Sequence, residues 1–301
     1  MKVAVTGASG MVGSALIKKL KSEGHEVVTY VRQGSANGTN TYLWNPENGT
    51  IDAAGLVGCD AVVNLAGENI AAKRWSAEQK ERIRSSRVKG TTLLANTIAK
   101  MSDKPEVLVS ASAIGFYGDR GDESLTENSA PGNGFLADVC REWEQSTRAA
   151  KDAGVRVVHA RLGVVLSKEG GALHKMLPIF QLGGGGVIGS GKQYMSWITL
   201  DDVVNALIFA IKTRSVSGAV NLVAPNSVRN SEFTDALGHA LHRPAVLPLP
   251  AFAAKMIMGE MADELLLASA RVEPLALEGN KFDFEYPNLQ GALLHTLGKS
   301  A

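Results

Sequence analysis

The chain has 301 residues, with 31 Lys and Arg against 30 Asp and Glu, which gives a formal net charge of +1. An apolar fraction of 45% and a charged fraction of 20% are typical of a globular protein with a substantial core and argue against disorder. The balanced charge lacks the basic character of nucleic-acid-binding proteins, so we expect no nucleic-acid partner. Glycine is in excess, at 32 residues.

Cysteine content and apolar runs indicate the compartment. The two cysteines, Cys59 and Cys140, are too few for a disulfide framework and favour a reducing environment. Apolar runs fall short of the roughly 18 residues that a membrane span requires. Gly7, Gly10 and Gly13 interrupt the N-terminal apolar segment, which argues against a signal peptide. We therefore expect a cytoplasmic protein without a membrane partner.

Short β-branched runs alternate with helical patterns through the first half of the chain, which predicts βαβ units and a parallel sheet. We predict strands at residues 3–6, 26–31, 60–66, 106–110, 155–162 and 220–223, and helices at residues 11–23, 76–100 and 134–153. The expected fold is a Rossmann-type, doubly wound α/β sheet with a smaller, irregular C-terminal substrate region.

Seven of the ten prolines lie after residue 165, where the alternation of strands and helices loosens. We therefore predict a cofactor domain formed by residues 1–165 and 197–224. The smaller substrate-side domain comprises residues 166–196 and 225–301. This division places a cleft between the two domains.

The strongest motif is a Gly-x-x-Gly-x-x-Gly sequence between the first strand and the first helix, formed by Gly7, Gly10 and Gly13. Such glycines permit a tight turn, close approach of the backbone to a pyrophosphate, and close packing of helix on strand. The helix N-terminus then faces the phosphates with its positive dipole end. We expect the following residues to bind a dinucleotide: Gly7, Ser9, Gly10, Met11, Val12 and Gly13. The alternative is that these are ordinary turn glycines.

The residue after the second strand indicates which dinucleotide binds. Arg32 stands 19 residues after Gly13, where NAD-binding proteins carry an acidic residue that binds the ribose 2′-OH. An arginine offers a positive, forked donor for a 2′-phosphate, so we predict NADP as the cofactor. The alternative is a solvated surface arginine.

Further segments resemble the extended short-chain dehydrogenase/reductase superfamily. Residues 60–68 look like its fourth strand and cofactor-lining turn, and residues 110–119 like the segment that supplies an active-site serine. Residues 161–166 are similar to its sixth strand, and residues 189–203 to the segment that re-enters the nucleotide domain. The resemblance implies that the turn after the fourth strand lines the cofactor: Leu65, Ala66, Gly67 and Glu68.

Residues 73–75, 86–88 and 241–245 narrow the resemblance to an atypical epimerase branch of this superfamily. Its members are NAD-dependent epimerase/dehydratase relatives, often named nucleoside-diphosphate sugar epimerases or cell-division inhibitor homologues. The resemblance covers essentially the whole chain. It identifies a family and not a reaction, because one fold hosts many activities.

The superfamily's catalytic Tyr-x-x-x-Lys pair is missing. Aligned on Glu144, the lysine position is Cys140 and the tyrosine position is Leu136. Leucine cannot exchange a proton, and cysteine cannot hold a fixed positive charge beside the nicotinamide ribose. The ordinary epimerase or dehydratase mechanism is therefore not expected.

Three other residues could carry the chemistry. Ser112 occupies the position of the superfamily's substrate-orienting serine, and the alternative is a hydroxyl that satisfies a backbone group at a strand end. Tyr117 carries the phenol nearest to this strand end and is the best replacement proton donor. The alternative is that Tyr117 is an aromatic residue packed in a turn, with its hydroxyl in a structural hydrogen bond. Cys140 is either a reactive thiol or a small buried residue.

Charged and aromatic residues near these segments have more than one interpretation. Glu68 could bind substrate hydroxyls or cap the next helix. Arg87, with Lys73 and Arg74, could bind cofactor phosphates or an anionic substrate, or be solvated. Tyr194 and Trp197 could line the cleft or belong to the core. The histidines lack metal-ligand spacing, so no metal is expected.

Two functions follow from these motifs. The first is an NADP-dependent oxidoreductase or epimerase-like enzyme that acts on a small carbonyl, hydroxyl or nucleotide-sugar substrate, with a proton supplied through Ser112, Tyr117 or water. The second is a non-catalytic NADP(H)-binding sensor. The sequence is compatible with a homodimer.

Overall fold

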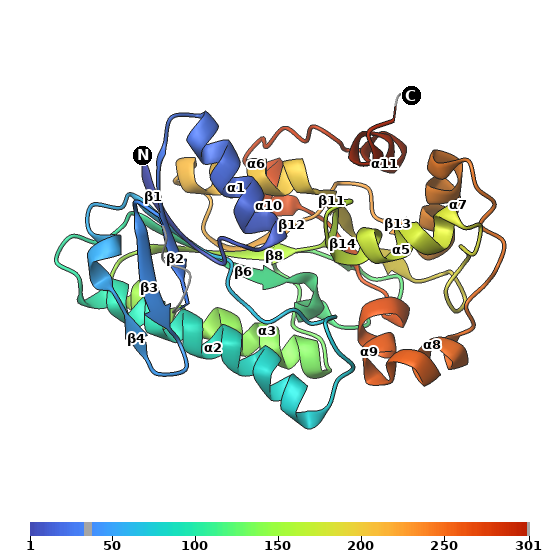
Figure 1. Cartoon of the computed structure of the whole chain (residues 1–301), viewed down its shortest axis with the longest axis horizontal. Coiled ribbons are helices and arrows are strands. Elements are labelled where there is room, and N and C mark those ends of the chain that lie inside the picture. The colour runs from blue at the N-terminus through green and yellow to red at the C-terminus, as the bar shows by residue number, and fades with distance from the viewer. Residues whose placement is uncertain (33–37, 300–301) are drawn as a thin grey trace.

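The computed structural model describes residues 1–32 and 38–299 and contains an eight-stranded sheet in the order β12-β8-β6-β5-β1-β2-β3-β4 (Figure 1). All neighbouring strands run parallel except β3 and β4, which are antiparallel. The strands are β1 (Lys2–Thr6), β2 (Glu26–Val31), β3 (Thr41–Asn45), β4 (Thr50–Ile51), β5 (Ala61–Asn64), β6 (Val107–Ala113), β8 (Arg156–Leu162) and β12 (Gly218–Leu222). The predicted doubly wound fold is confirmed.

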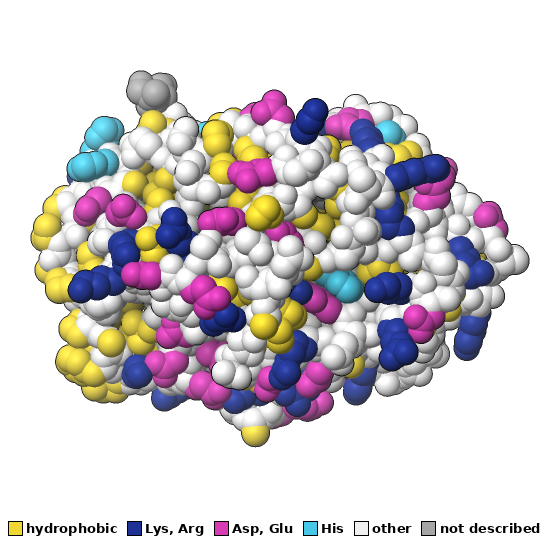
Figure 2. All heavy atoms as spheres, turned by 180° about the vertical axis from the view of Figure 1, so that it is seen from behind, with side chains coloured by type: hydrophobic (Ala, Val, Ile, Leu, Met, Phe, Trp, Pro, Cys, Tyr) yellow, Lys and Arg dark blue, Asp and Glu magenta, His cyan; other side chains and the backbone are white. Residues whose placement is uncertain are grey.

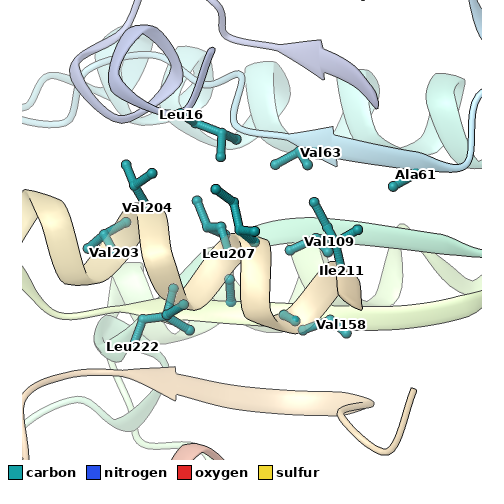
Figure 3. Packing of buried hydrophobic residues seen from close by; sticks show 14 of the residues in the cluster. Leu16, Ala61, Val63, Val109, Val158, Val203, Val204, Leu207, Ile211 and Leu222 are labelled. Atoms are coloured by element: carbon teal, nitrogen blue, oxygen red, sulfur yellow. The ribbon is translucent and has the colours of Figure 1, made fainter. Parts of the chain in front are cut away.

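Successive residues of each strand face opposite layers of helices. Val3 and Val5 of β1 pack in the layer of α1 (Met11–Ser22) and α6 (Leu200–Lys212), whereas Ala4 packs in the layer of α2, α3 and α4. These three helices are α2 (Ala77–Lys100), α3 (Phe135–Gln145) and α4 (Arg148–Asp152). Figure 3 shows the first layer, with contacts among Leu16, Val63, Val109, Val158, Val204, Leu207 and Ile211. Burial on both faces explains why these strands are apolar throughout.

A smaller set of elements forms a second core around Trp197. The helices that contribute to it are α5 (Gly171–Gln181), α7 (Asn230–Leu241) and α11 (Leu289–Leu297). The C-terminal part of the chain also contains α8 (Ala251–Met258), α9 (Glu260–Ala262), η3 (Asp263–Leu267) and α10 (Leu275–Gly279), whose Leu277 packs in the main sheet core. The paired short strands are β9 (Val164–Leu166) with β11 (Trp197–Thr199), β10 (Tyr194–Met195) with β13 (Val228–Arg229), and β7 (Ser124–Leu125) with β14 (Arg271–Val272). Two short turns, η1 (Ala53–Leu56) and η2 (Ile114–Tyr117), complete the elements.

The prediction of a single helix over residues 134–153 is wrong, because this segment forms two helices, α3 and α4. The hydroxyl groups of Ser146 and Thr147 donate hydrogen bonds to the carbonyl oxygens of Glu142 and Glu144, both at 2.7 Å. Such bonds compete with the helical backbone pattern. Thr147 also lies 2.9 Å from Nε2 of His159, which ties the break to β8.

The sheet also extends beyond the prediction, because β3 and β4 were not expected. β3 pairs with β2 and carries Trp44, whose side chain is buried. The indole lies against α2, where a Cβ added at Gly90 would stand 3.4 Å from the ring. Burial of one large aromatic side chain therefore holds β3, a strand near the edge of the sheet that has little alternation of its own.

The surface carries charges of both signs. Figure 2 shows Lys and Arg interspersed with Asp and Glu on one face of the molecule. Among the described residues, none of the helices has the length and apolar character needed to cross a membrane.

Asp202 joins the sheet layer to the C-terminal segment from a completely buried position on α6. Its carboxylate accepts hydrogen bonds from the backbone N–H groups of Glu285 and Tyr286 at 2.8 and 3.1 Å, and from the hydroxyl of Thr199 at 3.0 Å. Burial raises the pKa of Asp202, and these hydrogen bonds oppose the rise. The carboxylate thus fixes the backbone at Glu285 and Tyr286 to the start of α6.

We predict that Asp202→Ala lowers the free energy of unfolding by about 2–5 kcal/mol, because two backbone donors and a hydroxyl lose their acceptor. Chemical denaturation measures this loss. The control is Asp201→Ala on the same helix, whose carboxylate pairs with His295 at 2.8 Å on an exposed surface. That variant should lose less than about 1 kcal/mol. Equal losses in the two variants would contradict the role of Asp202.

Candidate functional site

The strand order reverses between β1 and β5, and the loops after these strands meet at the carboxyl edge of the sheet. In doubly wound folds, ligands bind at this point. The N–H of Leu65, directly after β5, donates to the carbonyl oxygen of Thr6 at the end of β1, at 3.3 Å. The glycine loop and the turn after β5 are therefore neighbours, as the motif and the family resemblance each required.

Glycines allow these two loops to touch. Gly7 has φ +69°, and a Cβ there would lie 2.7 Å from the carbonyl of Leu65. A Cβ at Gly13 would lie 2.2 Å from the carbonyl oxygen of Gly7. Both positions are too close for any side chain, so the two glycines fix the approach of the loop to β5 and of α1 to the loop.

The N-terminus of α1 is built to receive an anion. Among the described residues, no side chain caps this helix, and its N-cap is Gly10. Its first turn contains Met11, Val12 and Gly13 and no carboxylate. The backbone donors of this turn and the positive end of the helix dipole fit a phosphate, and the exposed Ser9 adds a hydroxyl beside them. The residues at this site therefore fit the pyrophosphate of a dinucleotide.

Arg32 follows the last residue of β2 and is exposed to solvent. Within the described ranges, it forms no ion pair. Because β1 and β2 are adjacent parallel strands, Arg32 lies at the same carboxyl edge as the glycine loop. A guanidinium at this place is suited to a phosphate on the adenosine ribose.

The turn after β5 contacts α2. The N–H of Glu68 donates to Oγ of Ser86 at 3.0 Å, and the Glu68 carboxylate accepts a hydrogen bond from Gln79 at 3.4 Å. The hydroxyl of Ser76 caps α2, so Glu68 does not fill the capping role proposed as its alternative. Gly67 is exposed, and a Cβ there would stand 3.2 Å from the guanidinium carbon of Arg87. Gly67, Glu68 and Arg87 are thus brought together beside the glycine loop.

Ser112 belongs to a buried polar network at the ends of β6 and β8. Its hydroxyl donates to Oε1 of Glu144 at 2.7 Å. Arg161 of β8 makes a bidentate ion pair with the same carboxylate, at 2.8 and 2.9 Å. The Arg161 guanidinium also lies 3.5 Å from the centre of the Phe116 ring. Burial lowers the pKa of Arg161, but the hydrogen bonds and charge of Glu144 more than offset this and raise it overall.

Tyr117 is fully buried at the far side of this network. Its hydroxyl accepts a hydrogen bond from Arg161 at 2.9 Å and donates one to Asn221 of β12 at 2.7 Å. Burial raises the pKa of Tyr117, although Arg161 opposes the rise. This geometry matches the alternative of a structural hydrogen bond, and the catalytic role of Tyr117 stays a prediction.

Glu144 and Arg161 were not among the catalytic or cofactor-binding residues predicted from the sequence. A signal for Arg161 is present in the sequence, because it lies between apolar residues near the end of a predicted buried strand, where a charge requires a partner. The identity of that partner depends on contact between α3 and β8, which the sequence alone does not reveal.

The positions expected for tyrosine and lysine lie on one face of α3. Leu136 is half-buried and Cys140 is buried. A Cβ at Gly115 would lie 3.2 Å from Leu136 and 3.9 Å from the sulfur of Cys140, so η2 packs on this face. Burial raises the pKa of Cys140 to about 11, although Arg87 acts in the opposite direction. The thiol is therefore protonated at neutral pH, which favours the small buried residue over a reactive nucleophile.

The remaining candidates lie outside this edge or on the surface. Lys73 and Arg74 are exposed. Trp197 is fully buried in the second core, which confirms the core interpretation. Tyr194 lies between the guanidinium groups of Arg229 and Arg271, at 4.6 and 5.3 Å, beside a polar pocket of about 210 Å³. Over residues 1–32 and 38–299, no three His, Cys, Asp or Glu side chains cluster as metal ligands would.

We predict that Glu144→Gln lowers the free energy of unfolding by about 3–5 kcal/mol, because it leaves the buried Arg161 without a carboxylate. The control is Glu142→Gln on the same helix, where the partner Arg84 lies 3.5 Å away and both side chains are about 40% exposed. That variant should lose less than about 1 kcal/mol. Denaturant titration of both variants measures the difference, and similar losses would mean that the buried pair does not stabilise this edge.

Comparison with known proteins gives matches over the whole chain. Residues 3–222 match the NAD dependent epimerase/dehydratase family, and residues 249–296 match a domain of unknown function, DUF1731. An epimerase family protein of Mycobacterium bovis is 47% identical over 291 residues, covering 97% of this chain and 96% of that protein.

Two solved structures are similar to this one. The human epimerase family protein SDR39U1, crystallised with NADPH, has a TM-score of 0.92 and 35% identity and covers 100% of both chains. A nucleoside-diphosphate sugar epimerase from Corynebacterium glutamicum has a TM-score of 0.82 and 39% identity, covering 99% of this chain and 58% of that one. These matches confirm the resemblance inferred from the motifs, and the chain belongs to the NAD dependent epimerase/dehydratase family.

Proposed function

We propose that this protein is an NADP(H)-binding oxidoreductase or epimerase-like enzyme for a small carbonyl, hydroxyl or nucleotide-sugar substrate. The observation that carries the proposal is the uncapped N-terminus of α1, held by Gly7 and Gly13 against the turn after β5. NADPH in the similar human structure supports the choice of cofactor.

Each part of the cofactor has residues that fit it. The glycine loop with Ser9, Met11 and Val12 would hold the pyrophosphate, and Arg32 would bind the 2′-phosphate. The turn formed by residues 65–68 would line the ribose and nicotinamide. The bound cofactor supplies hydride transfer, and the protein supplies orientation and electrostatics.

Ser112 is the residue best placed to exchange a proton near this edge. Its hydroxyl donates to the Glu144 carboxylate, so the serine oxygen can accept a proton from a substrate hydroxyl while its own proton passes to Glu144, and the reverse transfer returns a proton to a substrate oxygen. Arg161 fixes that carboxylate through two hydrogen bonds. Tyr117 fixes Arg161 in turn, so we assign Tyr117 a positioning role in the proposed reaction.

The missing tyrosine and lysine favour one competing function, a sensor that binds NADP(H) without turnover. Leu136 and Cys140 leave the usual proton-transfer position without a polar group that titrates near neutral pH. A panel of carbonyl compounds and nucleotide sugars separates the two functions through oxidation of NADPH. Turnover of any member supports the enzyme, and complete inertness of the NADPH-bound protein supports the sensor.

We predict that Arg32→Ala weakens NADPH binding about 10- to 100-fold, because one charge-assisted contact to the 2′-phosphate is lost. NADH affinity should change less than about threefold, because NADH lacks this phosphate. Calorimetric titration measures both affinities. The control is Arg148→Ala, an exposed arginine on α4, which should bind NADPH as the original protein does. Equal loss of NADPH and NADH affinity in Arg32→Ala would contradict the assignment.

We predict that Ser112→Ala lowers kcat/KM about 10²- to 10⁴-fold, the usual range for losing a group that transfers protons. Tyr117→Phe should retain NADPH affinity and show a smaller loss, because Arg161 keeps its ion pair with Glu144. Steady-state kinetics on the substrate found in the panel, with the NADPH dissociation constant measured in parallel, test both variants. Full activity in Ser112→Ala would exclude it from the reaction.

A further inference from the structure

Arg87 is a half-buried cation that lacks an acidic partner in the described part of the chain. Its guanidinium donates to the carbonyl oxygen of Ile83 one turn earlier on α2, at 3.0 Å, and lies 5.0 Å from the centre of the Trp143 ring. No Asp or Glu of residues 1–32 and 38–299 makes an ion pair with it. Most of its five N–H donors are therefore unused by the protein.

Such a charge is costly to keep. Burial lowers the pKa of Arg87, and the nearby Cys140 and Glu68 act in the opposite direction. Arginine nevertheless stays protonated in proteins, so the side chain is a true cation. The fixed partners of this guanidinium among the described residues are one carbonyl oxygen and the Trp143 ring, so most of its N–H donors are free to bind an anion.

The position of Arg87 relates it to the reaction edge. Thr91, one turn further along α2, accepts a hydrogen bond from Asn64 at the end of β5, at 2.8 Å. Arg87 therefore lies just beyond the carboxyl end of β5. Gly67 leaves this space open, because a Cβ would crowd the guanidinium at 3.2 Å. Cys140 of α3, which stands at the family's lysine position, is a neighbour of Arg87. The Arg87 guanidinium on α2 therefore places a positive charge near the position where the family has its lysine.

The residues proposed to bind the anionic groups of NADP lie elsewhere on this edge. The glycine loop and the N-terminus of α1 fit the pyrophosphate, and Arg32 stands at the end of β2 for the 2′-phosphate. Arg87 is a third positive site on the same edge, beside Leu136 and Cys140. An anion bound here would belong to a second ligand.

We propose that Arg87 binds an anionic group, a carboxylate or a phosphate, of the substrate that reacts beside the nicotinamide. The inference rests on the proposed function and narrows its substrate class to small acidic carbonyl or hydroxyl compounds. A planar guanidinium can hold either anion through two parallel hydrogen bonds, which would orient the substrate as well as attract it.

The test measures binding of oxalate and of inorganic phosphate to protein saturated with NADP⁺, by calorimetry, with NADPH affinity measured separately. The original protein should bind at least one of the two anions, and which one it binds selects carboxylate or phosphate. Arg87→Met should weaken that binding about 100-fold or more while NADPH affinity changes less than about threefold. Arg87→Lys, which keeps the charge but not the fork, should give an intermediate loss. The control is Arg82→Met, an exposed arginine on the same helix.

Three results would overturn the inference. The first is that neither anion binds the NADP⁺-loaded protein. The second is that Arg87→Met weakens NADPH and NADH binding equally, which would assign Arg87 to the cofactor pyrophosphate. The third is that Arg87→Lys and Arg87→Met bind the anion as well as the original protein. Failure of the original protein to bind NADPH would instead refute the proposed function, so the two failures are distinguishable.

Discussion

The contact between the glycine loop and the turn after β5 is the constraint on which the rest of the site depends. The α-carbon of Gly7 faces the carbonyl of Leu65, and Gly13 faces the carbonyl oxygen of Gly7, each at a distance that excludes a side chain. With these contacts, α1 starts directly above β1 and its N-terminal donors point along the carboxyl edge. Any larger residue would separate the helix from the strand and displace the phosphate site from the neighbouring loop.

Charge is distributed along this edge in two different ways. Arg161 is neutralised by Glu144 and enclosed by Phe116 and Tyr117, so its charge serves the fold and the orientation of Ser112. Arg87 and Arg32 have no such partner among the described residues and are open to anions. The same residue type therefore has opposite roles, which are decided by whether a carboxylate is packed against it.

The sequence was sufficient to predict a helix, strand or loop wherever the interactions that determine it join residues close together in the chain. The glycine spacing, the capping serine of α2 and the apolar runs of β1, β2 and β5 depend on neighbours along the chain, and their elements were predicted within a few residues. Tyr117 was different, because its partners Arg161 and Asn221 are 44 and 104 residues away. β3 depends on burial of Trp44 against α2, and Thr147 at the break after α3 also contacts His159 of β8. Such long-range pairings leave no periodic pattern in the sequence.

The family's tyrosine and lysine are absent from this chain, but other residues still supply polar groups at this edge of the sheet. Leu136 and Cys140 put no charge at the family's tyrosine and lysine positions, and burial keeps the Cys140 thiol protonated. One turn further along α3, Glu144 accepts a hydrogen bond from Ser112, and Arg87 brings a cation from α2. A sensor that only holds the cofactor needs no cation beyond those that fit the cofactor's own phosphates, and Arg87 is additional to the α1 N-terminus and Arg32. The arrangement therefore fits a site that receives a second, negatively charged molecule beside the cofactor.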